Sequence, residues 1–164
     1  MANGYYYRWG DQELIVVPVD DTTVVEIGDF IIKVSAGDTA DDSTLTTGYG
    51  APADYMVDGG DAAANRELGA DQLLGIAMSA HLSGAENDNI IVATAGVFEI
   101  IQQAAAAIEL GAEIEIYADA TGCSNQLIVA GSTSPIGHCV ELKAATGTGV
   151  MVKLIPQLFN QSSD

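Results

Sequence analysis

Histidine, cysteine and carboxylate side chains are the groups in this chain that could do chemistry, but their spacing does not assemble a catalytic group. The two histidines, His81 and His138, lie in different segments, and no Ser, Cys or Asp stands at a spacing typical of an activated nucleophile. His138 is next to Cys139, yet neighbouring side chains on a strand point to opposite faces. We therefore predict no catalytic residues and no enzymatic activity.

Metal and cofactor sites are not predicted either. Two Cys and two His scattered along the chain fall short of the three or four ligands of a zinc site. The acidic stretches 38–42 and 58–61 lack the alternating acids and the closing Glu of a calcium loop, so they are expected to be solvated. We expect Cys123 and Cys139 to be buried small apolar residues, with a single disulfide as the alternative.

The charge balance excludes two classes of partner. Lys and Arg number 5 against 23 Asp and Glu, which gives a formal net charge of −18. Nucleic-acid binding needs cations that neutralise phosphates, and anionic membrane surfaces repel such a chain. No apolar run approaches the roughly 20 residues of a membrane helix, and no signal peptide is expected at the N-terminus. The acidity would also suit a salty environment.

The stretch "NGYYYRWGDQ" (3–12) concentrates aromatic residues around a cation. Aromatic residues and Arg are enriched at interface hot spots, and the apolar run that follows could pair with a strand of another protein. We predict that residues 1–13 form an extended arm that docks on a partner; the alternative is that the segment folds back over the open end of its own domain. The predicted partner-binding residues are Tyr5, Tyr6, Tyr7, Arg8, Trp9, Leu14, Ile15 and Val16.

Short β-branched runs broken by Gly or Pro fill most of the remaining chain, which predicts an all-β fold. We expect a compact β-barrel or β-sandwich of short strands over 14–158, followed by a tail, 159–164. A short helix is plausible over 61–69, with Asp61 as N-cap and Gly69 as C′ residue, and a helical turn or an ordered loop over 102–111. The expected strands are 13–19, 22–27, 29–35, 73–80, 89–101, 112–118, 125–131, 136–144 and 149–155.

An internal pseudo-repeat organises these strands. The segment 26–36 aligns with 109–119, so that Gly28 matches Gly111, and 73–78 aligns with 135–140, so that Gly75 matches Gly137. A repeated glycine before a strand indicates a tight turn or a close backbone approach. The first half is longer, and its excess is expected to be a surface excursion over 37–70. Three side chains of that excursion are Tyr49, Tyr55 and Met56.

The order of motifs over 73–155 resembles the capsid cement, or head-decoration, proteins of tailed bacteriophages. The pattern is an apolar-Gly-apolar-Ala strand, a strand ending in Gly-Val-Phe-Glu, a strand opened by Gly and ending near Tyr-Ala-Asp-Ala, and a closing Gly-containing strand followed by a Val-rich one. Residues 14–36 match more loosely, and neither 37–70 nor the aromatic start is covered. The positions that carry the resemblance are 74–77, 96–99, 111, 117–120, 136–139 and 149–154.

This resemblance implies a structural virion protein made in the host cytoplasm. It would bind the outer surface of a capsid as a homo-oligomer, a trimer, with the major capsid protein as its partner and without catalysis. In the family, the N-terminal arm tends to reach onto the capsid, which would give Tyr5–Trp9 a location. Another class of function stays open, a carbohydrate-binding module that stacks sugars on the exposed Tyr and Trp. A third is a metal-dependent enzyme that uses the Asp-rich excursion.

Overall fold

A computed structural model shows an all-β chain with one α-helix, as the strand pattern predicts. It describes residues 5–9, 12–35, 45–56 and 61–156, with side chains from residue 12 onward. No helix in these ranges is long and apolar enough to cross a membrane. The elements are β1 (Tyr5–Trp9), β2 (Leu14–Pro18), β3 (Phe30–Lys33), β4 (Gly50–Pro52), a 3₁₀ turn (Ala53–Tyr55), α1 (Ala62–Asp71), β5 (Leu73–Ala77), β6 (Asn89–Ala93), β7 (Gly96–Gln102), β8 (Glu113–Asp119), β9 (Gly122–Ala130), β10 (Gly137–Cys139) and β11 (Gly149–Leu154).

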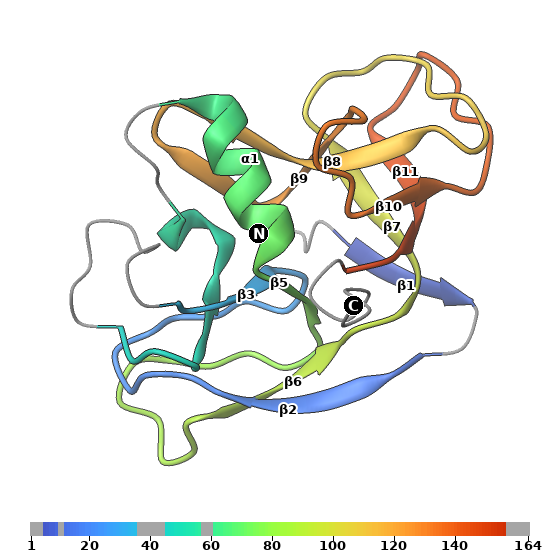
Figure 1. Ribbon diagram of the computed structural model, residues 1–164. Coiled ribbons are helices and arrows are strands. Elements are labelled where there is room, and N and C mark those ends of the chain that lie inside the picture. Colours follow the sequence, from blue (N-terminus) through green and yellow to red (C-terminus); the bar gives the residue numbers. More distant parts are fainter. Residues whose placement is uncertain (1–4, 10–11, 36–44, 57–60, 157–164) are drawn as a thin grey trace, which may run out of the picture.

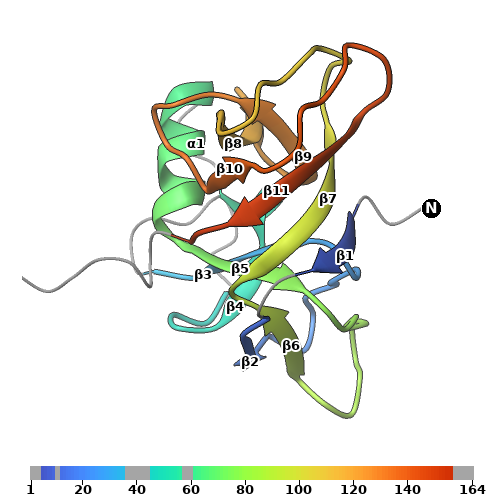
Figure 2. The same ribbon diagram turned by 90° about the vertical axis from the view of Figure 1, so that its right-hand side faces the viewer.

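The strands form two small sheets, each of which curls until its ends meet (Figures 1 and 2). The N-terminal lobe has the order β2-β6-β5-β3-β4, and a parallel bridge between Val19 and Gly50 closes it. The C-terminal lobe has the order β7-β11-β10-β8-β9, and a parallel pairing of Gln102 with Ile128 closes it; β1 is added outside β7. The expected all-β fold of short strands is confirmed, and it consists of two sheets.

Hydrogen bonds confirm the internal repeat. The Gly28 N–H donates to the Ala77 carbonyl at 2.9 Å, and the Gly111 N–H donates to the Cys139 carbonyl at 2.8 Å. Both glycines turn the chain at positive φ, 99° and 83°, where other residues are strained. Three residue pairs on neighbouring strands recur in the same way. The pair of Ile31 with Gly75 corresponds to Ile114 with Gly137, Val25 with His81 to Ile108 with Lys143, and Ala77 with Val92 to Cys139 with Val152.

Gly75 and Gly137 lie inside strands β5 and β10, so their expected role in turns is wrong. A Cβ at Gly75 would collide with the Ala93 carbonyl oxygen, and one at Gly137 would collide with the Lys153 carbonyl oxygen. Glycine is therefore required at both positions because a neighbouring strand approaches its backbone closely.

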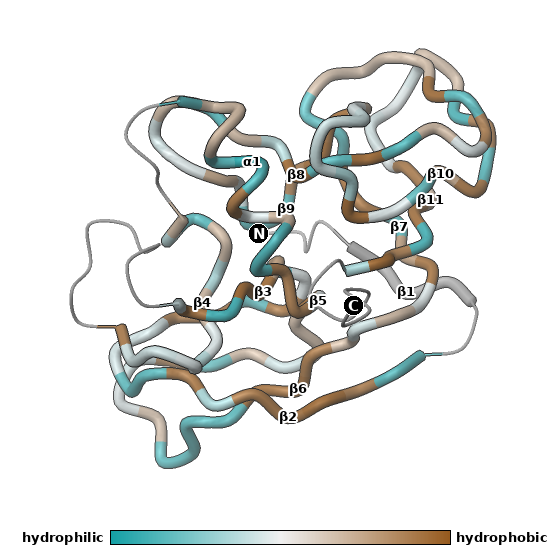
Figure 3. The backbone as a smooth tube through the Cα atoms, viewed as in Figure 1, coloured by the Kyte–Doolittle hydropathy of each residue, from teal (hydrophilic) through white to brown (hydrophobic). Residues whose placement is uncertain are grey.

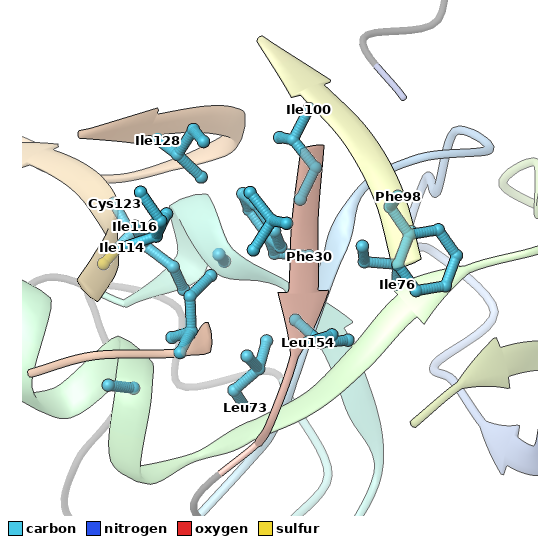
Figure 4. Packing of buried hydrophobic residues seen from close by; sticks show 14 of the residues in the cluster. Phe30, Leu73, Ile76, Phe98, Ile100, Ile114, Ile116, Cys123, Ile128 and Leu154 are labelled. Carbon is cyan, nitrogen blue, oxygen red and sulfur yellow. The ribbon is translucent and has the colours of Figure 1, made fainter. Parts of the chain in front are cut away.

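The larger core fills the C-terminal lobe and continues into the junction between the lobes (Figure 4). Phe30 and Ile76 from the N-terminal lobe pack there with Phe98 and Ile116 from the C-terminal lobe. A second, smaller cluster fills the N-terminal lobe around Val17, and Ile15 packs against it from the rim. The larger cluster therefore contains buried residues from both lobes, and the smaller one belongs to the N-terminal lobe.

Helix α1 begins as predicted, because the Asp61 carboxylate accepts the Ala63 N–H at 2.8 Å. It continues past Gly69 to Asp71, so Gly69 is not the C′ residue. Gly69 lies instead in the helix where it faces β9, and a Cβ there would stand 2.7 Å from the Cys123 sulfur. Close packing of the helix on the sheet, rather than helix termination, explains this glycine.

One further expectation differs from the structure, and one choice between two alternatives is decided. Residues 22–27 form turns with a single bridging residue, Val25, instead of a strand. The segment 103–107 is an ordered loop, so of the two alternatives stated for 102–111 the helical turn is absent from this described stretch.

A buried carboxylate ties α1 to the C-terminal lobe. Glu115, which is 1% exposed, accepts the N–H groups of Thr133 at 2.6 Å and Ser134 at 2.9 Å through one oxygen. Its other oxygen is 3.2 Å from the guanidinium of Arg66 on α1. These contacts satisfy a charge that would otherwise be costly to bury.

Candidate partner-binding site

The aromatic segment is strand β1, and its backbone pairs antiparallel with β7 of the same chain. Tyr5 stands opposite Ile100 and Trp9 opposite Val97. The segment therefore lies against its own domain as an added strand at the edge of the C-terminal sheet. The side chains of Tyr5, Tyr6, Tyr7, Arg8 and Trp9 lie outside the described residues, so their role in partner binding stays a prediction.

Strand β2 presents the other predicted binding residues at the end of its sheet order. Leu14 is 54% exposed and Val16 is 69% exposed, whereas Ile15 is half-buried against the core of the lobe. Their alternation follows from the period of a strand, because successive side chains point to opposite faces. Leu14 and Val16 are therefore available to a partner, and Ile15 supports them.

The exposed side of β2 continues across the sheet into a hollow. Val16 stands opposite Ile91 on β6, which is itself 42% exposed. Ile91 also lines a hollow of about 570 Å³ beside the β5–β6 connection, together with the exposed Leu82. Figure 3 shows the hydrophobic colouring along β2 and β6. We call Leu14, Val16, Leu82 and Ile91 the apolar stripe.

The C-terminal lobe has a hollow at the equivalent place, with different chemistry. It measures about 480 Å³, and its lining includes Glu99, Glu141 and Lys143. Through the repeat, Glu99 on β7 corresponds to Val16 on β2, since they face Met151 and Ile91 respectively. The repeat thus presents one polar hollow and one apolar one.

The His81 side chain contacts the backbone of the segment before β3. His81 is 3% exposed, and its Nδ1 lies 2.5 Å from the Thr23 carbonyl oxygen. The equivalent residue of the other lobe, Lys143, donates from Nζ to the Ala106 carbonyl at 2.8 Å. The two side chains make the same contact in the two halves of the repeat, which accounts for their burial.

The remaining sulfur and carboxylate groups offer no reactive arrangement in the described part of the chain. Cys123 and Cys139 are free and buried, and burial raises the pKa of the Cys123 thiol to about 12. A thiol of that pKa is protonated near neutral pH and therefore a poor nucleophile. Within the described ranges, no group of three or more His, Cys, Asp or Glu side chains could hold a metal ion.

The segment 37–70 is only partly a surface excursion. Tyr49 and Tyr55 are half-buried, and Met56 is fully buried in the larger core. The expectation that Met56 lies at the surface is therefore wrong. Its side chain fills space under the 3₁₀ turn because α1 and that turn pack against the C-terminal lobe instead of extending into solvent.

A polar seam joins the lobes beside the 3₁₀ turn. The Asp29 carboxylate accepts the Gln126 side-chain N–H at 2.8 Å and the Glu26 backbone N–H at 2.7 Å. Burial raises the pKa of Asp29, against the lowering effect of these hydrogen bonds, and the carboxylates of Glu26 and Asp54 raise it further. Burial also raises the pKa of Asp54.

This seam predicts a pH dependence of stability that Asp29→Asn removes. A folded-state pKa above the ordinary 3.8 means that ionisation of Asp29 costs more in the folded chain. Its contribution is fully favourable below the unfolded pKa and is lost as pH rises through the folded pKa. The free energy of unfolding of Asp29→Asn minus that of the wild type should therefore grow between about pH 3 and pH 7 in urea titrations.

Asp119 provides a control of opposite sign. The Thr121 hydroxyl and N–H donate to its carboxylate, at 2.5 Å and 2.7 Å, and lower its pKa. Its contribution is present above 3.8 and is lost as pH falls through the lower folded pKa. The free energy of unfolding of Asp119→Asn minus that of the wild type should therefore fall as pH rises. If this difference changed in the same direction for Asp29→Asn and Asp119→Asn, the opposite pKa shifts inferred for the two carboxylates would be contradicted.

Comparison with known proteins identifies the family. No curated protein and no solved structure matches the chain. A family model described as phage cement protein matches residues 50–154, which is more than half of the chain. The chain belongs to the phage cement protein family. The resemblance seen in the sequence is thereby confirmed, and with it a structural role at the phage capsid.

The match to the cement family begins at β4 and ends with β11. It covers the whole C-terminal lobe and leaves β1, β2 and β3 outside. The apolar stripe therefore combines Leu82 and Ile91 from the matched region with Leu14 and Val16 from the strand that precedes it. Leu82 and Ile91 were not predicted from the sequence, because an apolar residue on a short strand is expected to be buried as often as exposed.

Proposed function

We propose that this chain binds the outer surface of a phage capsid and stabilises the assembled shell by bridging neighbouring major capsid subunits. Membership of the phage cement protein family carries this proposal. The net charge of −18 supports the outer surface, because the same charge inside the shell would repel packaged DNA.

The mechanism follows from mass action and requires no catalysis. A protein that binds the assembled shell and not its separated subunits lowers the free energy of the shell by RT ln(1 + [L]/Kd) per site. A homotrimer, which we propose as the binding unit, would contact several capsid subunits at once, so that individually weak contacts add up. The four residues of the apolar stripe and the β1 segment are the proposed contact regions.

Heating undecorated and decorated heads tests this function. Addition of the purified chain to undecorated heads, assembled from the major capsid protein encoded with it, should raise the temperature at which the heads rupture. The rupture temperature should increase with the concentration of the chain until the sites are filled. Equal rupture temperatures, with the chain shown to be bound, would contradict the stabilising role.

A further inference from the structure

On the side away from β6, strand β2 has no neighbour among the described strands over Leu14–Val17. The Thr94 N–H donates to the Glu13 carbonyl, and the Val19 N–H donates to the Asp88 carbonyl, both at 2.8 Å. Hydrogen-bonded pairs alternate along an antiparallel ladder, so Ile15 and Val17 also bond to β6. The N–H and C=O groups of Leu14 and Val16 consequently point away from β6, and no described strand pairs with them there.

Proline at the end of the strand agrees with this assignment. Pro18 belongs to the same even-numbered series as Leu14 and Val16, and it has no N–H to donate. A proline is tolerated in a strand where its missing N–H would face away from the neighbouring strand. The free edge therefore extends over Leu14–Val17 and stops before Pro18.

The internal repeat shows what such an edge accepts. Residues Val97–Ile100 of β7 correspond to Leu14–Val17 of β2. The correspondence holds because β7 pairs with β11 in the C-terminal lobe in the same register as β2 pairs with β6 in the N-terminal lobe. In the C-terminal lobe β1 covers Val97–Ile100 as an added antiparallel strand. No described strand covers the same edge of the N-terminal lobe, which carries Val16 in place of Glu99.

The charges around this edge select the chemistry of its occupant. Strands β2 and β6 and the connection 78–88 contain no Lys or Arg. Glu86 lines the same hollow as Leu82 and Ile91, while Glu13 directly precedes β2 and Asp88 directly precedes β6. A segment flanked by Asp or Glu would be repelled at this edge. A segment that combines alternating apolar residues with flanking Lys or Arg would be attracted.

We propose that the free edge of β2, with the apolar stripe beside it, binds an extended segment of the shell protein as an added strand. The proposal rests on the proposed function and specifies how that partner is held. Main-chain hydrogen bonds to Leu14 and Val16 supply affinity, and contacts of alternate side chains with Ile91 and Leu82 supply specificity. Lys or Arg residues of the segment lie near Glu13, Glu86 or Asp88.

Matched charge substitutions test the proposal on undecorated heads. Val16→Glu places a charge beside Ile91 in the apolar stripe, at a side chain that is 69% exposed, so the variant should fold. Leu142→Glu is the control, since Leu142 is 73% exposed in the other lobe. Val16→Glu should weaken binding to heads at least 10-fold with an unchanged melting temperature, and Leu142→Glu should bind as the wild type does.

Amide hydrogen exchange provides a second measurement that does not depend on folding of a variant. In the free protein the amides of Leu14 and Val16 should exchange fast, while those of Ile15 and Val17 are protected by β6. On heads, Leu14 and Val16 should become protected as well. Unchanged exchange at these two amides in the bound state would overturn the proposal.

The outcomes separate this proposal from the proposed function. If the wild type binds heads and Val16→Glu binds equally well, the edge is not the docking site, but the shell-binding function stands. If Leu14 and Val16 are already protected in the free protein and Val16→Glu changes its oligomeric state, a second copy occupies the edge and the proposal is overturned. If the wild type does not bind heads, the proposed function itself fails.

Discussion

Replacement of Gly137 by alanine is expected to destabilise the fold by about 3 kcal/mol. The added Cβ would collide with the Lys153 carbonyl oxygen and stand 3.0 Å from the Val152 side chain. The colliding oxygen belongs to the backbone of β11, which pairs with both β10 and β7, so it cannot move without disturbing two ladders. The denaturation midpoint in urea, measured at constant m-value, gives the change in the free energy of unfolding.

Two variants sharpen this prediction. Gly75→Ala makes the equivalent collision with the Ala93 carbonyl in the N-terminal lobe, and it should be at least as damaging. Gly149→Ala is the control, because the atoms that its Cβ would meet are those of the Glu99 side chain, which can move aside. A loss below about 1 kcal/mol is expected there. Similar losses in all three variants would mean that strand propensity, and not close approach, explains the repeated glycines.

Replacement of Glu115 by alanine is expected to lower the free energy of unfolding by about 3 kcal/mol. The substitution leaves the N–H groups of Thr133 and Ser134 and the guanidinium of Arg66 without their shared acceptor. It also opens a cavity under α1. Glu115→Gln retains one carbonyl oxygen for the two N–H groups and loses the charge, so it should cost roughly half as much.

An exposed carboxylate on the same helix supplies the control for Glu115. Glu67 faces solvent, and Glu67→Ala should change the free energy of unfolding by less than about 0.5 kcal/mol. Equal effects of Glu115→Ala and Glu67→Ala in chemical denaturation would show that the buried carboxylate does not anchor α1. Salt should weaken the Glu115 contribution little, because buried pairs are poorly screened.

The strand content, the N-terminus of α1 and the duplication were all predictable from the sequence. β-branched runs and glycine punctuation are local signals, and Asp61 caps α1 through a contact two residues away. Gly28 and Gly111 revealed the repeat because a positive φ restricts the residue type wherever the turn recurs. The order of these local signals also sufficed to indicate the cement family.

Only the tertiary structure decided which strands lie side by side, and which strand edge has no neighbour among the described strands. The period of a strand separates two faces, but it does not say which strand lies alongside, because pairing joins residues far apart in sequence. Thus β1 lies against β7 rather than beside β2, Met56 is buried under a turn, and Val16 is exposed next to Ile91. The sequence determined two similar lobes, but only the tertiary structure placed β1 along β7 and left β2 without a neighbouring described strand at the equivalent edge.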